Sequence, residues 1–115
     1  MIQSIVQIVA LREHRNDVLE LLFMLNGATL ATPGCLRCCI YQDLREQDSF
    51  AILQEWECEN RLQQFVRSSD FSKVLALLDL AKEPPEVRFN TISATSGMEF
   101  IQQVKAVADS QQERE

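Results

Sequence analysis

The chain has 115 residues, of which 46% are hydrophobic and 24% charged, and its formal net charge is −6. This length fits a single domain, and the composition is that of a folded protein rather than of a disordered or low-complexity chain. With 11 Lys and Arg against 17 Asp and Glu, the chain lacks the basic cluster that binding to nucleic acid or to an anionic membrane requires. The N-terminal residues do not resemble a signal peptide, and no apolar run reaches the ~18 residues of a membrane span. We therefore expect a soluble, cytoplasmic protein.

Hydrophobic spacing and turn residues divide the chain into alternating strands and helices. An Ile- and Val-rich alternation at the start indicates a strand, and the apolar spacing after it indicates a helix that ends before Pro33-Gly34. A polar connection over 44–49 has the length of a hairpin loop. In chain order, the pattern predicts a strand over 2–11, a helix over 14–30, strands over 35–43 and 50–57, helices over 59–67 and 69–81, and a strand over 86–96.

This β-α-β-β-α-β order predicts an α+β, ferredoxin-like fold in which an antiparallel sheet carries the helices on one face. The domain is expected to span residues 1–101. Residues 102–115 form a polar C-terminal tail, which is compatible either with a frayed helix or with disorder.

The opposite face of this sheet is expected to be covered as well. In the third predicted strand, Phe50, Ile52 and Trp56 fall on one face, while Ala51 and Leu53 fall on the other. A face in contact with water would be cleanly polar. The simplest cover for a second apolar face is another copy of the same sheet, so we expect a homodimer with a closed, barrel-like interface.

Four cysteines are the most unusual feature of the sequence. Cys35, Cys38 and Cys39 have a C-x-x-C-C spacing that would suggest a metal site on a loop. On a strand, alternation puts Cys35 and Cys39 on one face and Cys38 on the other, so the three thiols do not converge and we expect no metal. A symmetric hairpin places Cys35 opposite Cys58, unless the register slips by two residues. These two thiols then either form a redox-sensitive bond or, like the others, are small buried apolar groups.

Short motifs spread along the chain carry a family resemblance. A Pro-Gly pair precedes the second predicted strand, a Glu-Trp pair ends the third, and a Ser-x-x-Phe segment follows the first short helix. Through these motifs, residues 2–101 resemble the antibiotic biosynthesis monooxygenase superfamily, whose members are dimeric α+β barrels. The segments that carry the resemblance are PGCLR at 33–37, YQD at 41–43, EWE at 55–57, RSSDF at 67–71 and PPEVRF at 84–89.

The resemblance implies a pocket between the sheet and the helices of each subunit. In cofactor-independent members of this family, a quinol or another electron-rich aromatic compound is bound and ionised there, and the substrate anion passes an electron to O2. The protein supplies binding, deprotonation and a dry, preorganised cavity. The resemblance therefore implies a monooxygenase without a cofactor, acting on a small aromatic substrate.

Seven side chains are candidates for the walls and polar contacts of this pocket. An aromatic ring can form a wall, an arginine can stabilise a phenolate, and a thiol can act as a soft nucleophile. Each candidate has a structural alternative, such as a core tryptophan, a tyrosine packed at a strand end or a surface ion pair. The candidates are Trp56 and Phe65 as walls, Tyr41, Arg88, Asn60 and Gln64 as polar contacts, and Cys39 as a nucleophile on the helix side of the sheet.

The sequence departs from the family where relatives carry histidine. Quinol-oxidising relatives often have His at the positions of Phe65 and Asp70, and haem-degrading relatives need Trp and His where Phe65 and Leu75 stand. The only histidine, His14, is expected to be exposed. We therefore expect no haem chemistry, and no general base is assigned. The alternatives to an oxygenase are a non-catalytic small-ligand-binding or regulatory dimer, or another enzyme, such as an isomerase, on the same fold.

Overall fold

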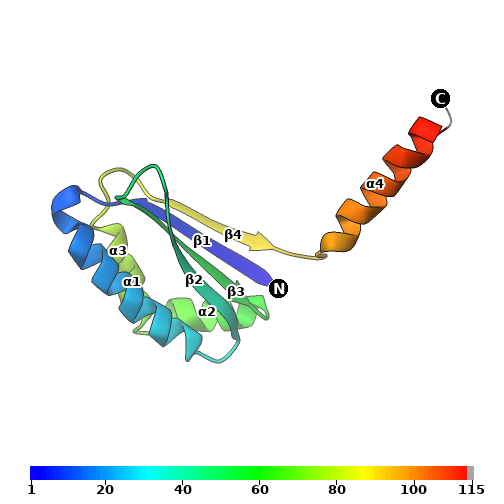
Figure 1. Cartoon of the computed structure of the whole chain (residues 1–115). Helices are drawn as coiled ribbons and strands as arrows, with labels where there is room; N and C mark the ends of the chain where they lie inside the picture. The colour runs from blue at the N-terminus through cyan, green and yellow to red at the C-terminus, as the bar shows by residue number, and fades with distance from the viewer. Residues whose placement is uncertain (114–115) are drawn as a thin grey trace.

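A four-stranded antiparallel sheet forms the centre of the molecule (Figure 1). The computed structural model describes the backbone of residues 1–113 and the side chains of residues 1–110. The elements are β1 (Ile2–Val9), the 3-10 helix η1 (Arg12–His14), α1 (Arg15–Leu30), β2 (Cys35–Gln42), β3 (Ser49–Trp56), α2 (Glu59–Arg67), α3 (Phe71–Leu78), β4 (Glu86–Thr91) and α4 (Met98–Glu113). The strand order β2-β3-β1-β4 confirms the predicted ferredoxin-like α+β fold.

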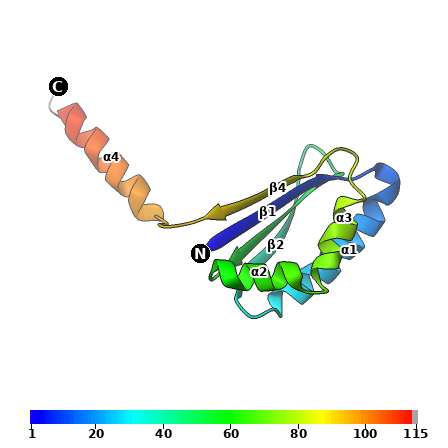
Figure 2. The ribbon, with the colours of Figure 1, turned by 180° about the vertical axis from the view of Figure 1, so that it is seen from behind.

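Helices α1, α2 and α3 all lie on the same face of the sheet (Figure 2). On that face the strand side chains are buried, because alternate residues of each strand point toward the helices. The helices contribute the residues that their 3.6-residue period turns inward. The buried apolar cluster comprises Ile2, Ile8, Ala10, Val18, Leu22, Leu25, Cys38, Phe50, Ile52, Trp56, Leu62, Phe65, Val74 and Leu77.

The outer face, which points away from these helices, carries a mixed set of side chains. Ile5 pairs with Leu53 across β1 and β3, and both are only half-buried. Val9 and Ala51 lie on the same face and are also half-buried. A single chain therefore leaves apolar residues at the centre of this face open, and the homodimer stays a prediction.

The register of the β2–β3 hairpin differs from the predicted one. Cys38 pairs with Gln54, which is one residue short of the symmetric register, and a bulge between Cys35 and Arg37 places Cys35 opposite Trp56. Cys58 lies beyond the end of β3, exposed at the start of α2. The predicted Cys35–Cys58 pairing is therefore wrong, and all four cysteines are free.

The same bulge changes which cysteines share a face. Because it inserts an extra residue into β2, Cys35 packs against the core cluster that contains Cys38. Cys39 points to the outer face, where it lies beside Arg37 and Tyr41. The predicted sharing of one face by Cys35 and Cys39 is wrong for this reason.

The C-terminal part of the chain forms an arm that stands away from the sheet (Figures 1 and 2). The last predicted strand is shorter than expected and ends at Thr91, although the Ile92 N–H still donates to the Met1 carbonyl at 2.9 Å. Helix α4 then runs without a break through residues 101 and 102, and residues 114–115 lie outside the described part. At its start, the Gly97 N–H donates to the Glu99 carboxylate at 2.7 Å and lowers the pKa of that carboxyl.

No helix within residues 1–113 has the length and apolar character needed to cross a membrane.

Replacing Gly34 by alanine is expected to lower the free energy of unfolding by about 2 kcal/mol, because its φ of 89° disfavours any side chain. The added Cβ would also lie 2.6 Å from Arg61 Cβ and collide with Arg61 Cγ. The matched control is Gly27→Ala in α1, where a Cβ meets nothing within 4 Å. This change is expected to raise the free energy of unfolding by up to about 1 kcal/mol. Urea unfolding of both variants measures the difference, and equal effects would contradict the prediction.

Candidate functional site

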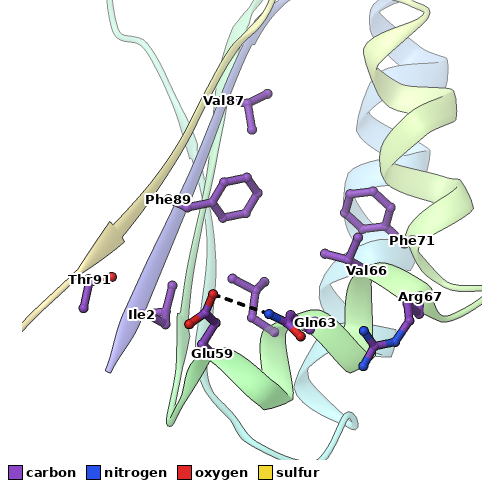
Figure 3. A pocket seen from close by; sticks show the side chains of 10 residues that line it. Ile2, Glu59, Gln63, Val66, Arg67, Phe71, Val87, Phe89 and Thr91 are labelled. Atoms are coloured by element: carbon purple, nitrogen blue, oxygen red, sulfur yellow. Dashed lines mark hydrogen bonds between the residues drawn. The ribbon is translucent and has the colours of Figure 1, made fainter.

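An open groove lies between the β4 edge of the sheet and helices α2 and α3 (Figure 3). Its volume is about 520 Å³, and it continues inward into a small cavity of about 40 Å³. Leu62, Phe71, Val87 and Phe89 line both spaces, so the groove and the inner cavity form one continuous site. Around these residues the groove is completed by Ile2, Val66, Thr91, Glu59, Gln63 and Arg67.

The groove exists because β4 is an edge strand that the helices do not fully cover. Pairing of Phe89 with Ser4 and of Val87 with Val6 turns both β4 side chains toward the helix side. Ser4 and Val6 are buried under the helices. Phe89 points to the same side, and it would be buried as well if the helices extended over β4. Instead Phe89 is 52% exposed, and its ring forms one side of the groove (Figure 3).

Two aromatic rings, Phe65 and Phe71, form the inner wall of the site, and Trp56 supports them from behind. Phe65 packs on Trp56 with ring centroids 5.0 Å apart, and Phe71 meets Phe65 edge-to-face at 5.8 Å. Trp56 is fully buried, and its indole N–H donates to the Gln54 side-chain oxygen at 3.2 Å. This stack fixes the positions of Phe65 and Phe71, so the wall is rigid and suited to a flat apolar ligand.

Polar groups lie in two places around this apolar wall. In the inner cavity, Ser4 and Gln54 offer neutral hydrogen-bonding groups. At the rim, Gln63 donates to the Glu59 carboxylate at 3.4 Å, and Arg67 supplies a cation at the end of α2 (Figure 3). The site is therefore apolar inside, with charge confined to its mouth.

Comparison with known proteins identifies the family. A family model described as antibiotic biosynthesis monooxygenase matches residues 1–77, which is more than half of the chain. The chain belongs to the antibiotic biosynthesis monooxygenase family. No curated protein matches it.

Solved structures of this family and its neighbours share the fold. A conserved protein from Methanosarcina mazei Go1 is 26% identical, with a TM-score of 0.71 over 77% of this chain and 89% of that one. A putative antibiotic biosynthesis monooxygenase from Deinococcus radiodurans is 20% identical, with a TM-score of 0.77 over 85% and 98%. A protein of unknown function from Bacteroides thetaiotaomicron, described as a possible oxidoreductase, is 17% identical, with a TM-score of 0.73 over 79% and 96%.

Four of the sequence candidates lie on the helix side of this family fold. Phe65 lines the inner cavity, and Trp56 lies behind it as its support rather than in the wall itself. Asn60 is exposed on α2, beside the rim residue Glu59. Gln64, also on α2, accepts a hydrogen bond from Arg61 at 3.4 Å on the exposed side of the helix.

The other candidates lie on the outer face, away from the groove. Arg37 donates to the Cys39 sulfur at 3.3 Å and to the Tyr41 hydroxyl at 3.2 Å, and it lies 3.7 Å from Glu55. The hydrogen bond from Arg37 lowers the pKa of the Cys39 thiol. Arg88 forms an ion pair with Glu86. None of these groups contacts the groove, so the structure separates the seven candidates into two surfaces.

Three apolar residues that line the groove were not predicted from the sequence, because the candidates were selected by their chemistry. Phe71, Val87 and Phe89 all belong to the motifs that carry the family resemblance, at 67–71 and 84–89. The alternation of a strand would have shown that Val87 and Phe89 share the face opposite Arg88. That signal was available, although it did not say which face meets the helices.

The positions that hold haem in some relatives do not fit haem here. Phe65 and Leu75 have no atom that binds iron, and Leu75 is exposed on α3. His14 lies half-buried near Glu13 and Asp17, at 4.0 and 3.9 Å. Within the described residues, no three His, Cys, Asp or Glu side chains come together as metal ligands would.

The buried thiol of Cys38 is expected to make stability depend on alkaline pH. Burial raises its pKa to about 11, whereas an unfolded thiol ionises near its ordinary pKa of about 8.5. Between these pH values the unfolded chain releases a proton that the folded chain keeps, so the free energy of unfolding falls by up to about 3 kcal/mol as pH rises. Urea unfolding under reducing conditions at pH 8 and 11 measures this decline. Cys38→Ala is expected to be less stable than the parent at both pH values, but its free energy of unfolding should fall less between them. A decline as large as that of the parent would show that Cys38 does not cause it.

Proposed function

We propose that the chain is a cofactor-independent monooxygenase that binds a quinol or another electron-rich aromatic compound in the groove. The observation that carries the proposal is the groove itself: its size, its rigid aromatic wall and its charged mouth, in a member of the antibiotic biosynthesis monooxygenase family. A flat ring fits between Phe71 and Phe89, with Phe65 at the inner end. Its hydroxyl groups then meet the polar rim.

The rim residues would perform the acid–base part of the reaction. Glu59 accepts a proton from the substrate hydroxyl, and Arg67 stabilises the resulting anion. The anion passes one electron to O2, and the substrate radical and superoxide combine into a peroxide anion. This anion takes back the proton from Glu59 to give an organic hydroperoxide, and loss of water from it leaves one oxygen atom as a carbonyl in the product. The apolar wall keeps bulk water from the anion and the radical pair.

The same proposal includes a cytoplasmic homodimer. The half-buried apolar residues at the centre of the outer face, Ile5 and Leu53, support pairing of two sheets. Four free cysteines are compatible with a reducing compartment.

Oxygen uptake by the purified, chelator-treated protein tests the activity against a panel of quinols and polyhydroxylated aromatics. We expect uptake above the autoxidation blank, and we expect Arg67→Gln to lower it about tenfold, since a charge-assisted hydrogen bond contributes about 1.5–3 kcal/mol. Arg61→Gln on the outer side of α2 is the matched control and is expected to keep the rate. Equal rates for the two variants would remove Arg67 from the mechanism.

The alternative is a non-catalytic dimer that binds a small apolar ligand. It is favoured by one observation: the polar groups of the inner cavity, Ser4 and Gln54, can donate and accept hydrogen bonds but are not acid–base catalysts. Binding of panel compounds, seen as a raised melting temperature, without any oxygen uptake would support this function over the oxygenase.

A further inference from the structure

Helix α4 presents an apolar face that no residue within 1–110 covers. All of its described side chains are exposed. Phe100, Ile101, Val104 and Val107 are each more than half exposed, and their spacing puts them on one side of the helix. Most helical stability in proteins comes from packing of an apolar face, and α4, with 16 residues, has no such packing within the described part of its own chain. The helix therefore needs a surface to pack on.

The groove at the β4 edge is the matching uncovered surface on the body of the molecule. Val66, Val87 and Phe89 are 40%, 42% and 52% exposed there. They come from two sides of a groove whose interior is apolar and whose charged residues stand at the rim (Figure 3). The described part of each chain thus carries both an uncovered apolar helix face and an apolar groove of matching character.

The path of the chain directs α4 away from its own groove. Thr91 lines the groove at the end of β4, and the Ile92 N–H continues the ladder with Met1 beyond it. The connection over 92–97 therefore leaves along the strand direction, and α4 stands clear of the body in both views (Figures 1 and 2). Filling its own groove would require these six residues to reverse direction and would break the ladder at Ile92.

We infer that α4 of a second copy packs its apolar face over the groove, and that the two copies exchange arms in this way. Covering the exposed parts of these side chains removes roughly 700 Å² at each arm and about 1,400 Å² in the pair, within the range of about 1,200–2,000 Å² for stable interfaces. The exchange closes the mouth of the groove, so the site of one copy is complete only with the arm of the other. It goes beyond the proposed function, since it holds whether or not the groove binds or oxidises a ligand.

A photo-crosslink with mixed isotopes tests which copy supplies the arm. The full chain carries p-benzoylphenylalanine in place of Val104, and it is unfolded and refolded with an equal amount of 15N-labelled chain. After irradiation, we expect cross-linked peptides that join α4 to the segments containing Val66 or Phe89, half of them combining one labelled and one unlabelled peptide. The same group at Gln102, on the opposite side of α4, is the control and is expected to give only background.

Two outcomes would overturn the inference. Groove cross-links that never combine the two isotopes would mean that α4 folds onto its own chain, and cross-links between two α4 helices would mean that the arms pair with each other. Sedimentation gives a second readout. Val104→Asp with Val107→Asp is expected to weaken the dimer about a hundredfold, which is about 2.7 kcal/mol, whereas Gln102→Asp leaves its Kd unchanged. Equal Kd values for all three proteins would also overturn it.

Discussion

Replacing Trp56 by alanine is expected to lower the free energy of unfolding by about 3–5 kcal/mol. The indole is fully buried, it stacks on Phe65 at 5.0 Å, and it donates to Gln54 at 3.2 Å. Alanine would leave a cavity under the aromatic wall and an unpaired buried oxygen on Gln54. Urea unfolding followed by circular dichroism at 222 nm measures the loss, because Trp56 is the only tryptophan and fluorescence disappears with it.

Two further variants separate packing from a general loss of aromatic surface. Trp56→Phe keeps a ring against Phe65 and is expected to be less destabilising than alanine. Phe23→Ala on α1 removes a ring that is 70% exposed and is expected to stay within about 0.5 kcal/mol of the parent. A Trp56→Ala protein as stable as Phe23→Ala would show that the stack does not support the wall. If the expected loss is found, Trp56→Ala is unsuitable as a control for activity. A lower activity of this variant would then reflect unfolding rather than the loss of a residue from the site.

The order of the elements was predictable because each one has a strong local pattern. The alternation in β1 and the Pro33-Gly34 stop after α1 required no tertiary information, and Gly34 indeed has the positive φ that its position demands. The end of β4 was not predictable in this way. Residues after Thr91 keep a strand-like composition. However, Thr91 already pairs with Ile2 at the start of β1, and only Met1 is left as a partner beyond it, so the strand ends there.

The hairpin register shows a different limit. Loop length alone gave a symmetric pairing, whereas the structure shifts the strands by one residue and adds a bulge beside Cys35. A single inserted residue moves every later side chain of a strand to the other face. The faces of Cys35 and Cys39 therefore depended on a local irregularity that the residue pattern does not reveal.

Of the residues that line the candidate site, the sequence predicted one wall, Phe65, and none of the polar contacts. Phe65 was expected as a wall because it stands where quinol-oxidising relatives often carry a pocket histidine, and an aromatic ring can form a wall. Tyr41 and Arg88 were chosen for their chemistry, and both proved to lie on the outer face. Which face of a strand meets the helices is a property of the assembled sheet, so chemical suitability alone did not locate the site.

Filling the groove is expected to abolish ligand binding while leaving the fold intact. In Val87→Trp, an indole would enter the groove from β4 and occupy the space beside Phe89 that the proposed ligand needs. We expect binding of a panel quinol to weaken about a hundredfold, which corresponds to about 2.7 kcal/mol. Because Val87 is 42% exposed and borders an open groove, the larger side chain fits there without displacing the core, and the free energy of unfolding is expected to change by less than about 1 kcal/mol.

Thermal shift and oxygen uptake together measure this effect. The melting temperature of Val87→Trp without ligand is expected to match the parent, while the increase on adding the quinol is lost. Leu75→Trp is the matched control, because Leu75 is exposed on α3 and does not line the groove. It is expected to keep both the ligand-induced shift and any oxygen uptake. A Val87→Trp protein that still binds the quinol with the parent Kd would place the ligand outside the groove, and the outer face with Arg37, Cys39 and Tyr41 would then be the surface to test.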